Sequence, residues 1–156
     1  MTRWNLGRKA ATVAATMGLS AVGLMVATPA QAALSDCNSG RFCIFQYSNG
    51  TGLYAKFTEG TDNLGSSKVF GGRMNDKASY VWNRTSTPWC VYQHKDEGGH
   101  SMMVGSGRKG NLLVKDPRDG FTWDNRVSSV RPALHIVPPR NPGAAYYICI
   151  GSFIQY

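Results

Sequence analysis

The 156-residue sequence lacks the short signatures by which common enzyme classes are recognised. It has no His-Glu-x-x-His pair, no Gly-x-Ser-x-Gly turn and no glycine-rich phosphate loop that ends in Lys followed by Ser or Thr. It also has no Cys-x-x-Cys pair, so a structural zinc site is disfavoured. We therefore expect a protein that is not an enzyme and that acts by presenting a surface.

After residue 33 the sequence has no apolar run long enough to span a bilayer. The run over residues 10–27 follows the basic residues Arg3, Arg8 and Lys9 and precedes the small-residue sequence Ala30-Gln31-Ala32. This order is typical of a secretion signal that is cleaved, and the threonines and glycines within the run argue against the alternative of an uncleaved membrane anchor. We predict a signal peptide over residues 1–32 and a secreted, extracellular protein without a stable membrane anchor.

Acidic residues are scarce, with 9 against 17 basic ones and a formal net charge of +8. Removal of residues 1–32 takes away three basic residues and no acidic one, which leaves a formal charge of +5. The basic residues are scattered, apart from a short cluster at Arg108 and Lys109. A modest, dispersed excess on an exported protein favours solvated loops, and we expect no nucleic acid as a partner.

All four cysteines lie after residue 32, an even number that suits an oxidising compartment. Cys37 and Cys43 bracket a turn-forming Asn-Ser-Gly sequence, which favours a local disulfide. That choice leaves Cys90 to pair with Cys149, although four cysteines allow three pairings in all.

The sequence contains an internal repeat of about 45 residues. Cys43-Ile44-Phe45-Gln46 aligns with Cys90-Val91-Tyr92-Gln93, and Gly52 with Gly99. Further along, Asn75-Asp76-Lys77-Ala78-Ser79 aligns with Asp124-Asn125-Arg126-Val127-Ser128. The repeat predicts two similar units, at about 42–86 and 89–131.

Each unit is predicted to form strands, because short aromatic and β-branched runs alternate with turn residues and no helical apolar period is sustained. The expected strands are residues 42–47, 53–57, 79–82, 89–94, 100–104 and 128–131. We predict an all-β fold in which two Greek-key motifs form an antiparallel sandwich over residues 33–132. Residues 133–156 are expected to be a proline-rich linker and an apolar tail. The tail is interpreted either as an extra strand pinned by Cys149 or as a strand that binds a partner.

The spacing from Phe45 to Gly52 and from Tyr92 to Gly99, each followed by an Asx-Asx-x-x-Ser sequence, resembles the βγ-crystallin Greek-key motif. Together with the secretion signal and the close cysteine pair, the chain is similar to the bacterial secreted metalloproteinase-inhibitor family. The resemblance implies a βγ-crystallin-like fold and an inhibitor that blocks the cleft of an extracellular metalloprotease. Calcium-binding modules and killer-toxin-like proteins with this fold are the alternatives.

The resemblance also implies two calcium clamps, and the residue types present suit a weak Ca²⁺ site because they supply carboxylate, amide and hydroxyl oxygens. An equally simple interpretation is that these side chains satisfy turn backbone groups. The predicted metal ligands are Asn75, Asp76, Ser79, Asp124, Asn125 and Ser128.

No inhibitory contact can be assigned from the sequence. Cys90-Val91 is a candidate contact bond, and Cys43-Ile44 a weaker one, because an apolar residue follows a cysteine that is expected to be in a disulfide. Strand alternation, however, predicts that Val91 and Ile44 are buried. His94 and His100 flank a predicted hairpin tip and are expected to be solvated rather than metal-binding.

Overall fold

The computed structural model describes residues 34–66, 69, 72–136, 143 and 145–149. The predicted signal peptide, most of the predicted linker and residues 150–156 lie outside this part of the chain. Within it, no helix is long and apolar enough to cross a membrane.

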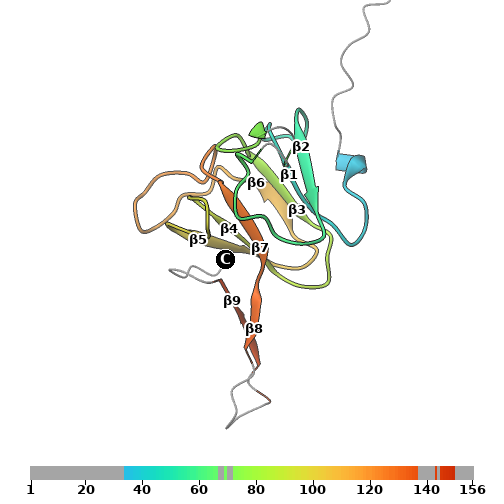
Figure 1. Ribbon diagram of the computed structural model, residues 1–156, viewed down its shortest axis with the longest axis vertical. Coiled ribbons are helices and arrows are strands. Elements are labelled where there is room, and N and C mark those ends of the chain that lie inside the picture. Colours follow the sequence, from blue (N-terminus) through green and yellow to red (C-terminus); the bar gives the residue numbers. More distant parts are fainter. Residues whose placement is uncertain (1–33, 67–68, 70–71, 137–142, 144, 150–156) are drawn as a thin grey trace, which may run out of the picture.

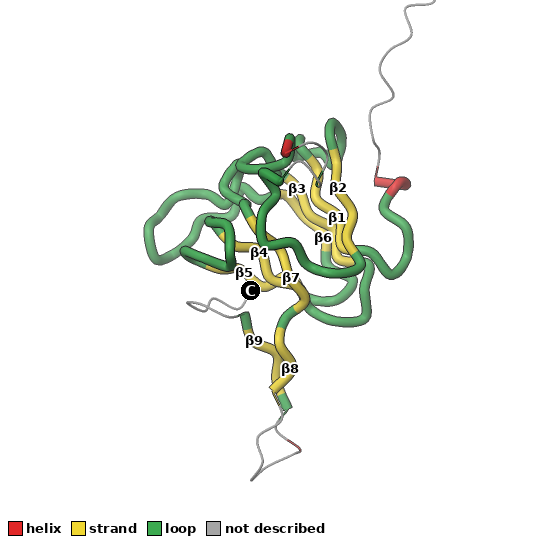
Figure 2. The backbone as a smooth tube through the Cα atoms, in the orientation of Figure 1, coloured by secondary structure: helices red, strands yellow, loops and turns green. Residues whose placement is uncertain are grey.

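The described chain consists mainly of short strands joined by long loops, with a short 3-10 helix near its start (Figures 1 and 2). Two antiparallel sheets, with strand orders β2-β1-β3-β6 and β5-β4-β7, form the body, and β8 and β9 form a separate ribbon. The elements are η1 (Leu34–Asp36), β1 (Phe42–Phe45), β2 (Tyr54–Phe57), β3 (Tyr80–Asn83), β4 (Trp89–Tyr92), β5 (Ser101–Val104), β6 (Lys109–Asn111), β7 (Ser129–Pro132), β8 (Leu134–Ile136) and β9 (Tyr146–Ile148).

The two units exchange chain segments, which is how the Greek keys close into one sandwich. Strand β6 comes from the second unit but pairs with β3 of the first sheet, with Val81 opposite Gly110. In the opposite direction, Thr61 of the first unit bridges to Val130 of β7, with hydrogen bonds of 2.8 and 3.0 Å. Neither unit can therefore complete its sheet alone, and the fold confirms the predicted all-β Greek-key class.

The main core lies between the two sheets, because alternate residues of their strands face each other. Phe42 of β1 stacks on Trp89 of β4 with ring centroids 4.6 Å apart and parallel planes. Ile44 and Val91, two residues further along their strands, are fully buried beside this pair. Both β1 and β4 are central strands, and every residue in them is buried.

The aligned glycines occupy equivalent positions in the two hairpins. Gly52 and Gly99 have φ angles of 85° and 72°, which glycine adopts without strain. A Cβ atom on either would lie 2.7 Å from an aromatic ring, that of Tyr47 or His94 respectively. The close approach of a ring to a bare backbone explains why glycine recurs at this place in both units.

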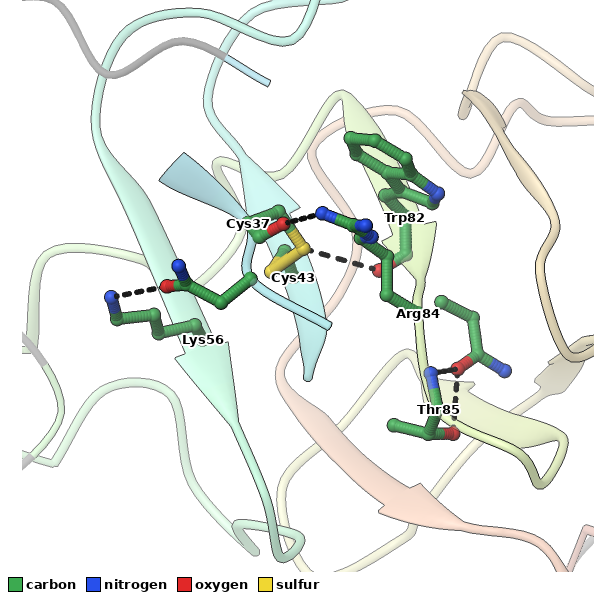
Figure 3. Close-up of a disulfide and its surroundings, with 8 residues drawn as sticks. Cys37, Cys43, Lys56, Trp82, Arg84 and Thr85 are labelled. Carbon is green, nitrogen blue, oxygen red and sulfur yellow. Dashed lines mark hydrogen bonds between the residues drawn. A yellow bond between two sulfur atoms is a disulfide. The ribbon is translucent and has the colours of Figure 1, made fainter. Parts of the chain in front are cut away.

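Two disulfides join Cys37 to Cys43 and Cys90 to Cys149, the pairing that the sequence favours. The first attaches the N-terminal segment to the outer face of the first sheet (Figure 3). The second ties β9 to β4, so the β8–β9 ribbon stays next to the second sheet while projecting from the body (Figure 1). Cys149 thus pins an extra strand in the described part of the tail.

Candidate functional site

The two bonds considered as inhibitory contacts lie in the interior. Cys43, Ile44, Cys90 and Val91 are all fully buried, in the central strands of the two sheets. Each bond is flanked by hydrogen-bonded strands on both sides. A peptidase cannot reach either bond unless a sheet opens, so any contact surface must be sought on the loops.

The predicted calcium clamps lie side by side and are joined by two backbone hydrogen bonds. Asp76 and Asn125 occupy equivalent positions with φ angles of 52° and 56°. The Asp76 amide donates to the carbonyl of Val127 at 3.1 Å, and the Asn125 amide donates to the carbonyl of Ala78 at 3.0 Å. The structure thus places the two loops next to each other where the two units meet.

The first clamp has its carboxylate occupied. One carboxylate oxygen of Asp76 accepts a hydrogen bond from the Ser128 hydroxyl at 2.8 Å, and the other accepts one from the side-chain amide of Asn75 at 2.6 Å. Asn75 and Ser128 also line a surface pocket of about 460 Å³, and Lys95 adds a positive charge to its wall. A cation here would have to displace two existing hydrogen bonds and approach an ammonium group.

The second clamp offers a free acceptor. Asp124 Oδ2 accepts a hydrogen bond of 3.0 Å from the side-chain amide of Asn125. Asp124 Oδ1 is buried and has no hydrogen-bond partner among the described residues. A buried carboxylate oxygen without a partner is costly, and a bound cation would remove that cost. Asp124 thus offers one carboxylate oxygen without a hydrogen-bond partner, which Asp76 does not.

A cluster that sequence reasoning missed forms around His100. Its Nδ1 lies 2.8 Å from Asp116 Oδ2 and 3.7 Å from Asp119 Oδ2, and these three side chains are near enough to share an ion. The aspartates are 16 and 19 residues further along, in the loop between β6 and β7, and only the fold brings them to β5. The sequence predicted that His100 is solvated at the hairpin tip, whereas its ring contacts the buried Asp116 carboxylate.

Arginines neutralise this cluster, which makes it a salt-bridge network rather than a metal centre. Arg118 Nε donates to Asp116 Oδ1 at 3.0 Å, and Arg126 Nη2 donates to Asp119 Oδ2 at 2.5 Å. Burial opposes the charge on Asp116, but hydrogen bonds from Arg118 and His100 outweigh it and lower the pKa of this carboxyl. The hydrogen bond from Arg126 lowers the pKa of Asp119 to about 2.

Basic residues on the first sheet are used in aromatic contacts. The Arg84 guanidinium lies 4.7 Å from the centre of the Trp82 ring, and Lys109 Nζ lies 4.8 Å from it. Arg84 also donates to the carbonyl of Cys37 at 2.6 Å (Figure 3). Arg118, by contrast, binds the carbonyl of Ser101 on the second sheet. These three basic residues are thus engaged within the molecule, two of them at Trp82 and one at β5.

Exposed apolar side chains gather in the loop between β6 and β7. Leu113, Val114 and Phe121 are 52, 44 and 68 % exposed. Val114 also lines an apolar groove of about 360 Å³ between β5 and β6, together with Met102 and Met103. This loop therefore carries three of the six large apolar side chains that are exposed in the described part of the chain.

Comparison with solved structures shows the class of fold. The fold is that of a βγ-crystallin domain: a solved structure described as evolution of the eye lens βγ-crystallin domain fold matches with a TM-score of 0.50 and 16% identity, covering 61% of this chain and 87% of that one. A βγ-crystallin from an archaeon (TM-score 0.46, 21% identity, 61% and 99% covered) and one from Flavobacterium johnsoniae (0.45, 24%, 58% and 90%) also match. No curated protein sequence matches significantly.

Residues 30–104, somewhat under half of the chain, match the model of peptidase inhibitor family I36, which supports the inhibitor family that the sequence resembles. The match supports a peptidase inhibitor rather than an enzyme, with a peptidase as its partner. The matched stretch holds the first unit and the first two strands of the second.

Proposed function

We propose that the chain is a secreted inhibitor of a metalloprotease and that it acts by filling the active-site cleft. The match of residues 30–104 to peptidase inhibitor family I36 carries this proposal. The two disulfides support an extracellular setting, where such bonds persist. The burial of the four residues around Cys43-Ile44 and Cys90-Val91 favours obstruction by a surface loop over substrate-like presentation of a strand.

A direct test uses residues 33–156, oxidised and purified, against a thermolysin-type metalloprotease with a short fluorogenic substrate. We expect stoichiometric inhibition at micromolar or lower inhibitor concentrations. A serine and a cysteine peptidase assayed in parallel serve as class controls. Inhibition confined to either control class would contradict the metalloprotease assignment.

A second candidate function is calcium binding at the Asp124 clamp, and the unpartnered Asp124 Oδ1 supports it. For a dissociation constant of about 0.1 to 1 mM, 10 mM Ca²⁺ would stabilise the fold by about 1.4 to 2.7 kcal/mol. This corresponds to a rise in melting temperature of roughly 4 °C or more relative to a chelator.

Two matched variants test the calcium proposal. Asp124→Asn should abolish the calcium-dependent rise, whereas Asp76→Asn should retain most of it, because both oxygens of Asp76 are already hydrogen-bonded. Equal melting temperatures of the wild type in Ca²⁺ and in chelator would reject the site.

A further inference from the structure

The loop that leaves β6 and returns toward β7 is held at both ends by buried side chains. We call residues 112–123 the apolar loop; it projects from the sandwich past β5 (Figures 1 and 2). Leu112 at its start and Trp123 at its end are 1 and 0 % exposed and belong to the main core. The Trp123 amide donates to the carbonyl of Val114 at 3.1 Å. The loop therefore starts and ends at fixed points.

The middle of the apolar loop is braced by the salt-bridge network. Asp116 is fully buried, and its amide donates to the carbonyl of Phe121 at 2.8 Å. Its carboxylate contacts His100 of the β4–β5 hairpin, while Arg118 donates to the carbonyl of Ser101 on β5 at 3.0 Å. These contacts tie the tip of the loop to a neighbouring strand.

The most exposed apolar side chain is also held in place. Phe121 is 68 % exposed, and its ring lies 5.6 Å from the guanidinium of Arg126. Arg126 is itself fixed by Asp119. Three of the six large apolar side chains that are exposed in the described part of the chain lie in this loop. A stiff backbone that holds apolar groups in solvent is costly in isolation, and its arrangement suits insertion into a partner.

We propose that the apolar loop is the segment that enters the active-site cleft of the inhibited peptidase. Phe121 is the anchor that fills an apolar specificity pocket of the peptidase, and Leu113 and Val114 cover the rim of the cleft. This inference rests on the proposed function. The apolar loop itself lies outside the stretch that matches the inhibitor family, because the match ends at Val104.

A peptidase cleft is the partner that this geometry fits best. Such clefts are concave, largely apolar pockets with a few polar groups, and they accept a convex segment. A segment that is already ordered loses little conformational entropy on binding, so its buried apolar area contributes more fully to affinity. The bracing by Asp116 and Arg118 supplies that order without a disulfide in the loop.

Inhibition constants of loop variants test the proposal. We expect Phe121→Ala to weaken inhibition of the metalloprotease by roughly 30-fold, the size of a hot-spot truncation. Tyr146→Ala is the matched control, because Tyr146 is an aromatic residue 50 % exposed on the β8–β9 ribbon, and it should change inhibition less than about threefold. Both positions are exposed, so both variants should melt like the wild type.

A brace variant supplies a second readout. Asp116→Asn leaves every exposed apolar side chain in place but removes the charge that Arg118 and His100 contact. We expect weaker inhibition together with cleavage by the peptidase between residues 113 and 121, detected by mass spectrometry.

The possible outcomes separate the two proposals. Inhibition by the wild type that Phe121→Ala and Asp116→Asn leave unchanged would overturn the loop assignment and leave the inhibitor function standing. Failure of the wild type to inhibit any metalloprotease, serine or cysteine peptidase tested would overturn the proposed function and this inference with it.

Discussion

The two disulfides close loops of very different length, and their removal should therefore have unequal effects. Cys37–Cys43 spans 6 residues of sequence and Cys90–Cys149 spans 59. We compare the double variants Cys37→Ala/Cys43→Ala and Cys90→Ala/Cys149→Ala. All four cysteines are nearly or fully buried, so each pair of substitutions removes the same atoms from similar surroundings.

The expected magnitudes follow from the entropy that each cross-link removes from the unfolded chain. In the loop-closure relation the short bridge contributes about 2.2 kcal/mol and the long bridge about 4.2 kcal/mol at 25 °C. The cavity and transfer terms are shared by the two double variants, so the difference of about 2 kcal/mol depends mainly on loop length. The variant without Cys90–Cys149 should be the less stable one.

Urea unfolding followed by tryptophan fluorescence measures both free energies, because Trp89 and Trp123 are buried in the main core. Thermal melting gives a second estimate, with a difference of about 10 °C between the two variants. Equal stabilities, or a less stable Cys37→Ala/Cys43→Ala variant, would refute the reasoning. That result would mean that the β8–β9 ribbon is not a cooperative part of the fold.

Two further predictions concern single polar residues. Asn83 is fully buried; its side chain donates to the carbonyls of Thr87, Val104 and Gly105 and accepts from the Thr85 amide. Asn83→Ala should therefore lower the free energy of unfolding in urea by about 3 kcal/mol, because these carbonyls would lose their donor. A loss below about 1 kcal/mol would contradict this. The pKa of Asp119 is lowered from 3.8 to about 2, so the stability it contributes is present above about pH 4 and is lost as the pH falls toward 2. Asp119→Asn should therefore flatten the fall in melting temperature between pH 4 and pH 2, and a parallel fall in both proteins would exclude the ion pair as its cause.

Much of the sandwich could be predicted because its information is local and is present twice. The aromatic and β-branched runs gave six strands to within about two residues at each end, and the turn glycine pair Gly52 and Gly99 marked equivalent hairpins. The exchange of β6 into the first sheet was not predicted, because Lys109-Gly110-Asn111 has no strand pattern of its own. Its place is determined by pairing with β3, and Leu112 then enters the core.

The candidate site was less predictable because it depends on contacts between distant residues. Asp116 and Asp119 appear in the sequence as ordinary loop residues, and nothing near them indicates that His100 will contact both. The clamps were recognisable as a motif, but the hydrogen bonding of their carboxylates was not. The free acceptor on Asp124 and the occupied carboxylate of Asp76 become visible only when hydrogen bonds are assigned.

Two surfaces of the domain, around Trp82 on the first sheet and around Phe121 on the apolar loop, differ in how far internal contacts occupy their aromatic side chains. Around Trp82 the cations Arg84 and Lys109 lie against the ring, so much of its interaction capacity is already used within the molecule. Around Phe121 the internal contacts fix the backbone and one face of the ring while most of the side chain stays exposed. Binding by the first surface must break existing contacts, whereas binding by the apolar loop only removes solvent. The loop is therefore the surface on which a peptidase gains affinity at the lower cost.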